Sequence, residues 1–172
     1  MSDQNKNQEA FVETLKETQR GPAMKKLIDY LANNTDFFSK DNGELLDKTT
    51  RLWVAANMEY GNFCKDTKTE NDRQLMNSIS VAALLCLIGQ TTEAQDSVIG
   101  DTDADTALYI IQNLGVRLTN EEYAAIFYYR GIYTGCSERY ARNCERAYHN
   151  YCLPLILHLA WENVEYTDRY MN

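Results

Sequence analysis

The chain has 172 residues, 44% of them hydrophobic and 24% charged, which suits a single domain with its own core and excludes a disordered chain. Its net charge of −8 argues against broad binding to nucleic acids or anionic membranes, which requires clustered Lys and Arg. Only two prolines and eight glycines interrupt the sequence, which favours helices over a turn-rich β architecture.

The first predicted helix covers about residues 8–20 and ends at Gly21-Pro22, a strong helix-breaking pair. We therefore divide the chain into an N-terminal helix or extension, 1–22, and one helical domain, 23–172. The domain begins with predicted helices over 24–33 and 44–63.

A polar run over 65–73 predicts a loop, and the segment after it, SISVAALLCLIG at 78–89, is apolar nearly all round. That pattern is typical of a fully buried helix rather than a surface one. After an acidic connection over 91–105, further helices are predicted over 103–114, 120–131, 137–152 and 155–169. We therefore expect an all-α fold, a single compact helical bundle around a central helix at about 78–89.

The five cysteines are an odd number without the spacing of a disulfide framework: Cys64, Cys86, Cys136, Cys144 and Cys152. The first ten residues are polar apart from Met1 and Ala10, so we expect no secretory signal. No apolar run reaches the roughly 20 residues that cross a bilayer. Reduced thiols in a cytoplasmic protein are the simplest interpretation.

The order of these segments resembles a compact HD-domain phosphohydrolase family of phage and bacterial genomes. The segments that carry the resemblance are LIDYLANNTDFF (27–38), GELLDKTTRLW (43–53), SISVAALLCLIGQ (78–90), LGVRLTNEEYAAIFYYRG (114–131) and LILHLAWENVEYTD (155–168). In such enzymes, histidines and aspartates from several helices hold divalent metals that activate water against a phosphate ester. The resemblance thus implies an HD-like bundle and a metal site.

Other residues occupy the positions where this family keeps its metal ligands. They are Lys48 for the first His, Cys86-Leu87 for the His-Asp pair, Asp103 and Tyr129 for two further histidines, and Trp161 for the final Asp. Lys48 is protonated at neutral pH and Leu87 has no lone pair, so neither can replace a ligand. We therefore expect no catalytic residues, no bound metal and no cofactor.

Two other patterns could bind a metal, and both are incomplete. Asp101, Asp103 and Asp105 begin like a calcium loop, but the sixth and twelfth positions are Thr106 and Gln112 rather than Gly and Glu. A solvated acidic loop is the better interpretation. The group Cys144, His149 and Cys152 matches no zinc spacing, and packed cysteines are favoured over zinc.

At helical spacing, the segment SERYARNCERAYHNY at 137–151 is strongly amphipathic. One stripe carries Arg139, Arg142, Arg146 and His149, and the opposite stripe carries tyrosines and Cys144. An ordinary basic face above an aromatic core face explains this pattern. The functional alternative is an anion-binding site, because Arg guanidinium groups at this spacing can form bidentate hydrogen bonds with phosphates or carboxylates.

The resemblance also brings Lys48, Tyr129 and Trp161 towards one cavity, with Arg51 and Arg130 nearby in sequence. A cation and two aromatics there could hold a phosphate and a base, or the larger rings could fill the cleft and close it. The residues that we expect to bind the ligand are Lys48, Arg51, Tyr129, Arg130, Arg139, Arg142, Arg146 and Trp161.

The main hypothesis is a catalytically inactive HD-fold protein that sequesters a nucleotide-like anion. The family's occurrence in phages suggests counter-defence against a host immune nucleotide signal. The alternatives are an adaptor or inhibitor that binds a host protein, and a residual metal-dependent phosphohydrolase that uses Asp103. No nucleic-acid or membrane partner is expected, and a homo-oligomer is left open.

Overall fold

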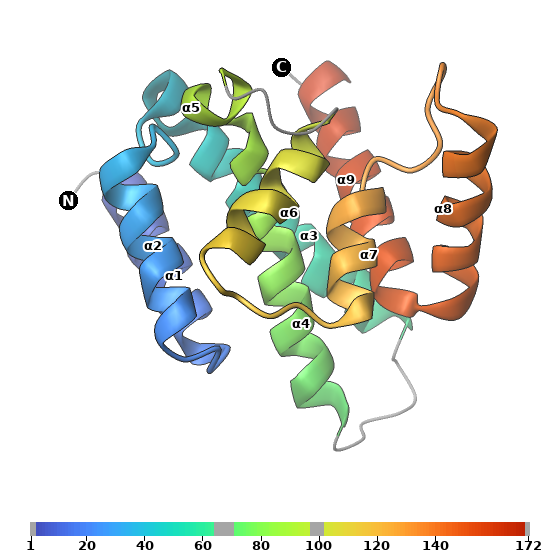
Figure 1. Ribbon diagram of the computed structural model, residues 1–172, viewed down its shortest axis with the longest axis horizontal. Coiled ribbons are helices and arrows are strands. Elements are labelled where there is room, and N and C mark those ends of the chain that lie inside the picture. Colours follow the sequence, from blue (N-terminus) through green and yellow to red (C-terminus); the bar gives the residue numbers. More distant parts are fainter. Residues whose placement is uncertain (1–2, 64–70, 97–101, 171–172) are drawn as a thin grey trace.

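The structure, a computed structural model, describes residues 3–63, 71–96 and 102–170, and all regular elements within these ranges are helices (Figure 1). The elements in chain order are α1 (Asp3–Glu17), α2 (Pro22–Asn34), the 3₁₀ helix η1 (Lys40–Gly43), α3 (Glu44–Phe63), α4 (Asn71–Leu85), the 3₁₀ helix η2 (Ile88–Gln90), α5 (Thr92–Gln95), α6 (Asp103–Asn113), α7 (Asn120–Tyr128), α8 (Glu138–Asn150) and α9 (Cys152–Tyr170). The all-α prediction is confirmed.

Helix α4 lies at the centre of the bundle, in contact with α1, α3, α7 and α9 (Figure 1). Every residue from 78 to 89 is buried, as the apolar run predicts. The bounds differ from the prediction, because α4 already begins at Asn71 and ends at Leu85. The buried chain then turns and continues as η2, since burial on all sides does not mark where a helix ends.

Helix α1 belongs to the same core as the rest of the chain. Its Phe11 and Leu15 are buried, and the Phe11 ring lies 5.2 Å from the ring centre of Phe37 and 5.5 Å from that of Phe38. Gly21 takes the positive φ of 68° that the turn into α2 requires, and Pro22 starts that helix. The proposed boundary at residue 22 is therefore a turn, with one hydrophobic core on both sides of it.

Capping side chains fix the starts of the helices around the site. Thr102 caps α6, Ser137 caps α8, and Thr119 with Glu122 forms a capping box at α7. Helix α7 ends at Tyr128, three residues before the predicted end, and α9 begins at Cys152, three residues before its predicted start. Helix α8 lies at the edge of the molecule opposite α1 and α2 (Figure 1).

The polar and acidic connections are only partly as predicted. Residues 71–73 of the expected loop belong to α4, and residues 64–70 lie outside the described ranges. The acidic connection contains the short helix α5, and Asp101 of the calcium-like pattern lies outside the described ranges. Within the described part of the chain, no helix has both the length and the apolar character needed to span a bilayer.

Candidate functional site

An aromatic pair fills the place where the resemblance puts the metal centre. Tyr129 follows the last residue of α7, Trp161 lies in α9, and their ring centres are 4.9 Å apart with the planes at 87°. Tyr129 is 0% exposed and Trp161 is 7% exposed. Burial, together with the nearby Cys86 thiol, raises the pKa of the Tyr129 phenol. The two rings therefore pack edge to face against each other and leave no open space between them for a ligand.

Two cations lie against these rings. The Lys48 ammonium is 4.6 Å from the ring centre of Trp161, and the Arg130 guanidinium is 5.7 Å from the same ring and 5.5 Å from that of Tyr129. Arg130 also donates from Nε to the Tyr129 hydroxyl at 2.8 Å. The favourable cation–ring contacts help to hold both charged side chains beside a largely buried aromatic pair.

Each of these cations is also paired with an acid, as is Arg51. Lys48 contacts Glu165 at 2.5 Å and Asp168 at 3.6 Å. Arg51 contacts Asp168 at 2.7 Å and Asp47 at 2.9 Å. Although burial opposes its charge, hydrogen bonds to Asp168 and Asp47 raise the pKa of Arg51 above its ordinary value. Lys48 and Arg51 are therefore neutralised by carboxylates of the chain, which weakens their attraction for a ligand phosphate.

The structure assembles only part of the expected set of ligand-binding residues. Four of them form one connected group, in which Lys48 contacts Trp161 and Arg130 contacts both rings: Lys48, Tyr129, Arg130 and Trp161. Arg51 joins this group through Asp168, which it shares with Lys48. The remaining three are exposed on α8, away from this group, and Arg142 pairs with Glu138 of its own helix: Arg139, Arg142 and Arg146. Their helix is amphipathic as predicted, with Cys144 and Ala147 buried on the opposite side.

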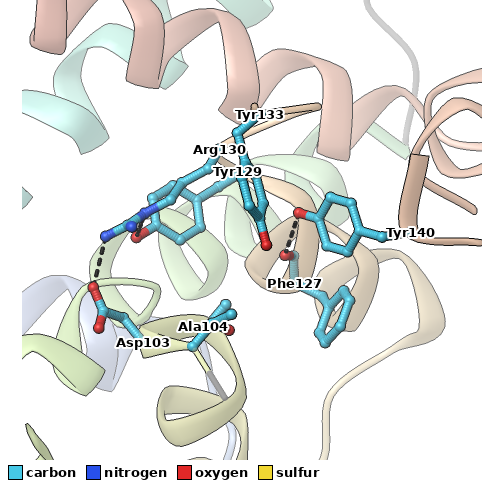
Figure 2. A pocket seen from close by; sticks show the side chains of 8 residues that line it. Asp103, Ala104, Phe127, Tyr129, Arg130, Tyr133 and Tyr140 are labelled. Atoms are coloured by element: carbon cyan, nitrogen blue, oxygen red, sulfur yellow. Dashed lines mark hydrogen bonds and ion pairs between the residues drawn. The ribbon is translucent and has the colours of Figure 1, made fainter. Parts of the chain in front are cut away.

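A pocket of about 450 Å³ opens beside the aromatic pair (Figure 2). Its lining comes from the start of α6, the end of α7 with the turn after it, and the first turn of α8. The lining residues are Thr102, Asp103, Ala104, Phe127, Tyr129, Arg130, Tyr133 and Tyr140. The volume lies within the range of about 300–1,000 Å³ that is usual for small-molecule sites.

One wall of the pocket is aromatic. The ring centre of Tyr140 lies 5.3 Å from that of Tyr133 and 5.9 Å from that of Phe127, so the three side chains form a connected group. Figure 2 shows Tyr133 and Tyr140 pointing towards each other across this side of the pocket. Ser137 caps α8 through the Tyr140 amide, which places Tyr140 in the first turn facing the pocket. Such a wall suits stacking against a flat ring.

The opposite wall carries an ion pair. Arg130 donates from Nη2 to an Asp103 carboxylate oxygen at 2.6 Å, and the Arg130 side chain remains 45% exposed. Burial would lower the pKa of Arg130, but the neighbouring Tyr129 and Asp103 raise it. Two of the five guanidinium N–H groups are used, by Tyr129 and Asp103, which leaves three as donors towards the pocket or solvent. This wall therefore offers a donor and an acceptor side by side.

Sequence reasoning identified Tyr129 and Arg130 but missed the rest of this pocket. The sequence pattern places Asp103 at a metal position that the resemblance implies, and it does not mark the aromatic residues Phe127, Tyr133 and Tyr140 as ligand contacts. The signal was present in the segment 127–140, where five of fourteen residues are aromatic. The sequence alone does not distinguish aromatic residues that line a pocket from aromatic residues of a core, because that distinction depends on where α6 and α8 lie.

The described residues contain no group of three or more His, Cys, Asp or Glu side chains placed to hold a metal ion. Of the zinc-like group, Cys144 is buried on α8, whereas His149 and Cys152 are exposed. Comparisons of the chain with models of protein families, with curated proteins and with solved structures find no match. The HD-like assignment stays a prediction from sequence.

Proposed function

We propose that the chain is a binding protein that holds a nucleotide-like ligand in the pocket beside Tyr129, without hydrolysing it. The observation that carries the proposal is the pocket itself, in which an aromatic wall faces the Arg130–Asp103 pair. Of the sequence-based set, Arg130 remains a ligand contact, and the buried Tyr129 positions it by accepting a hydrogen bond from its Nε. Asp103, Phe127, Tyr133 and Tyr140 replace the other contacts.

The lining matches the two parts of such a ligand. A nucleobase has two flat faces that stack on aromatic side chains, and stacking is worth about 1–3 kcal/mol per base. Its edge presents hydrogen-bond donors and acceptors side by side. The Asp103 carboxylate can accept from such an edge while the Arg130 guanidinium donates to it or to an attached phosphate.

The charge of the pocket limits the ligand further. Arg130 and Asp103 together contribute no net charge, and the α8 arginines lie outside the lining. A polyphosphate would meet one guanidinium that is already shared with a carboxylate. We therefore favour a ligand with few charges, such as a nucleoside monophosphate or a cyclic nucleotide, over a triphosphate.

Binding without turnover is supported by the residues around the aromatic pair. A metal hydrolase needs three or more imidazole or carboxylate ligands with lone pairs for the ion. The side chains beside Trp161 are instead an ammonium, a guanidinium and a phenol. A sequestering protein in phage counter-defence, as the resemblance implies, would need this kind of tight binding without hydrolysis.

The test is calorimetry with nucleoside monophosphates, cyclic mononucleotides, a nucleoside triphosphate and inorganic phosphate. A mono- or cyclic nucleotide should bind more tightly than either phosphate or the triphosphate, and the titrated ligand should be recovered unchanged. Tyr140→Ala should weaken binding about 5- to 150-fold, the range expected for one lost stacking contact.

The matched control is Tyr109→Ala, which removes a tyrosine that is 46% exposed on α6 and absent from the pocket lining. It should bind like the wild type. If no member of the panel binds, or if Tyr140→Ala binds as the wild type does, this pocket is not a nucleotide site.

A further inference from the structure

Asp103 and Arg130 present their polar groups in a definite order on one wall of the proposed pocket. Arg130 Nη2 donates to Asp103 Oδ2 at 2.6 Å, and Oδ1, the second oxygen of the carboxylate, lies beyond it (Figure 2). The side chains of Asp103 and Arg130 are 30% and 45% exposed, so a ligand in the pocket can reach both. Along this wall, the guanidinium donors are therefore followed by two acceptors, Oδ2 and then Oδ1.

Packing and hydrogen bonds hold both side chains in place. Asp103 is the first residue of α6, directly after its N-cap Thr102. The Asp103 carbonyl oxygen packs so closely on Gly89 that a Cβ at Gly89 would lie 2.0 Å from it. Arg130 donates from Nε to the hydroxyl of the buried Tyr129 at 2.8 Å, and its guanidinium lies 5.5 Å from the centre of that ring. The row of polar groups is therefore ordered before a ligand binds, which lowers the entropic cost of binding.

Guanine has the complementary order on the edge that it uses for base pairing. This edge presents an acceptor, O6, followed by two donors, N1–H and the N2 amine. When O6 accepts from the Arg130 guanidinium, N1–H can donate to Asp103 Oδ2 and the amine to Oδ1. Guanine therefore makes three hydrogen bonds with this wall, and two of them are to a charged carboxylate, which strengthens them.

The other bases make at most two of these hydrogen bonds. Adenine and cytosine each present a ring nitrogen that accepts beside one amine that donates, so they use the guanidinium and one carboxylate oxygen. Uracil presents O4, N3–H and O2, which places its O2 against Asp103 Oδ1, acceptor against acceptor. A polar group that leaves water without gaining a partner lowers the affinity.

We propose that this pocket binds guanine nucleotides selectively and that Asp103 determines the specificity. The inference rests on the nucleotide-binding function proposed above and adds the identity of the base. The base packs against the aromatic wall and turns its pairing edge towards Asp103 and Arg130. That wall is formed by Phe127, Tyr133 and Tyr140. The phosphate points away from Asp103, because two anionic groups repel each other.

The experiment is calorimetry of the full chain with the 5′-monophosphates and the 3′,5′-cyclic monophosphates of guanosine, inosine, adenosine, cytidine and uridine. Inosine is the matched ligand for guanosine, because its base has O6 and N1–H and lacks only the amine. The guanosine ligand should bind about 10- to 150-fold more tightly than the inosine ligand, the range for one hydrogen bond to a charged group. The adenosine, cytidine and uridine ligands should also bind more weakly than the guanosine ligand.

Asp103→Asn tests whether this residue reads the base. Asparagine keeps one acceptor, which stays beside the Arg130 donors, and replaces the second acceptor by an N–H donor. Xanthosine monophosphate complements this new order, because its base carries an oxygen, O2, in place of the guanine amine. The variant should therefore bind the guanosine ligand about 10-fold or more weakly than the wild type and bind the xanthosine ligand more tightly than the wild type does. A purely structural role of Asp103 would weaken the binding of all ligands together.

Asp105→Asn is the matched control, because it makes the same substitution two residues further along α6 and outside the pocket lining. It should keep the wild-type preference for guanosine. A wild type that binds nucleotides but binds the guanosine and inosine ligands equally overturns the guanine assignment and leaves the proposed function standing. A wild type that binds no nucleotide overturns both. If Asp103→Asn keeps wild-type helical circular dichroism and the wild-type preference for guanosine over xanthosine, Asp103 does not determine the specificity.

Discussion

Arg20 and Glu122, 102 residues apart in the chain, form an ion pair that ties the segment after α1 to the first turn of α7. The Glu122 side chain is 0% exposed and also accepts hydrogen bonds from Ser78 Oγ at 2.7 Å and from the Thr119 amide at 2.8 Å. One carboxylate therefore joins the N-terminal region, the central helix α4 and the cap of α7.

Arg20→Ala should destabilise the fold by about 2 kcal/mol, because it leaves a buried carboxylate without its cation. The two remaining hydrogen bonds and the partial exposure of Arg20 keep the loss below the range for fully buried pairs. Urea unfolding followed by circular dichroism measures the change. Arg142→Ala is the control, since both side chains of the Arg142–Glu138 pair are mostly exposed, and it should cost less than about 0.5 kcal/mol. Equal losses in the two variants would show that the Arg20 pair adds nothing.

Features that depend on neighbouring residues in the sequence are predicted better than features that depend on tertiary contacts. Helix α3 has the predicted bounds, 44–63, and α7 begins at the predicted residue 120, after its cap Thr119, because periodicity and capping are local. The buried run 78–89 is right in burial but not in helix bounds, since a run that is apolar all round contains no polar residue to mark its end.

The candidate site was less predictable for the same reason. The exposed arginine face of α8 followed from spacing, but the partners of the cations did not. Lys48 and Arg51 find their acids 117 residues away, and Asp103 reaches Arg130 from another helix. Pairing over such distances depends on tertiary packing, which no local pattern encodes. Whether larger rings fill or leave open a cleft is likewise decided by packing.

Gly89→Ala should destabilise the fold by about 2–3 kcal/mol or more, because a methyl group there would overpack η2 against α6. An added Cβ would lie 2.0 Å from the Asp103 carbonyl oxygen and 3.0 Å from the Ala107 nitrogen, both backbone atoms that cannot rotate away. Gly61→Ala is the control within α3, where a Cβ meets nothing within 4 Å. It should stabilise the helix by up to about 1 kcal/mol. Thermal and urea unfolding of both variants check the pair of predictions, which fail if Gly89→Ala is neutral.

Alkaline pH should weaken the fold through one buried and two half-buried phenols. Burial raises the pKa of Tyr129, Tyr140 and Tyr148 above the ordinary value of 10.0. Above pH 10 the unfolded chain loses phenolic protons that the folded chain keeps, so the free energy of unfolding is highest below pH 10 and falls as pH rises past it. The buried Cys86 thiol, with a raised pKa, acts in the same direction from its ordinary value of 9.0.

Urea midpoints at pH 8, 9, 10 and 11, with phenolate absorbance recorded during unfolding, test this dependence. The midpoint should fall steadily above pH 9, and part of the phenolate signal should appear only with unfolding. Tyr129→Phe should make the dependence shallower, because one of the shifted phenols is removed. A midpoint that does not change between pH 8 and 11 would contradict the prediction.

Adding manganese distinguishes the proposed binding function from residual metal-dependent hydrolysis. An ion beside Trp161 would face the Lys48 ammonium and the Arg130 guanidinium, which lie 4.6 and 5.7 Å from that ring. Asp103, the carboxylate nearest to Arg130, already accepts its hydrogen bond at 2.6 Å. A site filled at 100 times its Kd would add about 2.7 kcal/mol of stability. We expect instead no rise in Tm with 1 mM Mn²⁺ and no release of nitrophenol from bis(p-nitrophenyl) phosphate. Manganese-dependent hydrolysis that disappears in Asp103→Ala would establish the hydrolase and exclude binding without turnover.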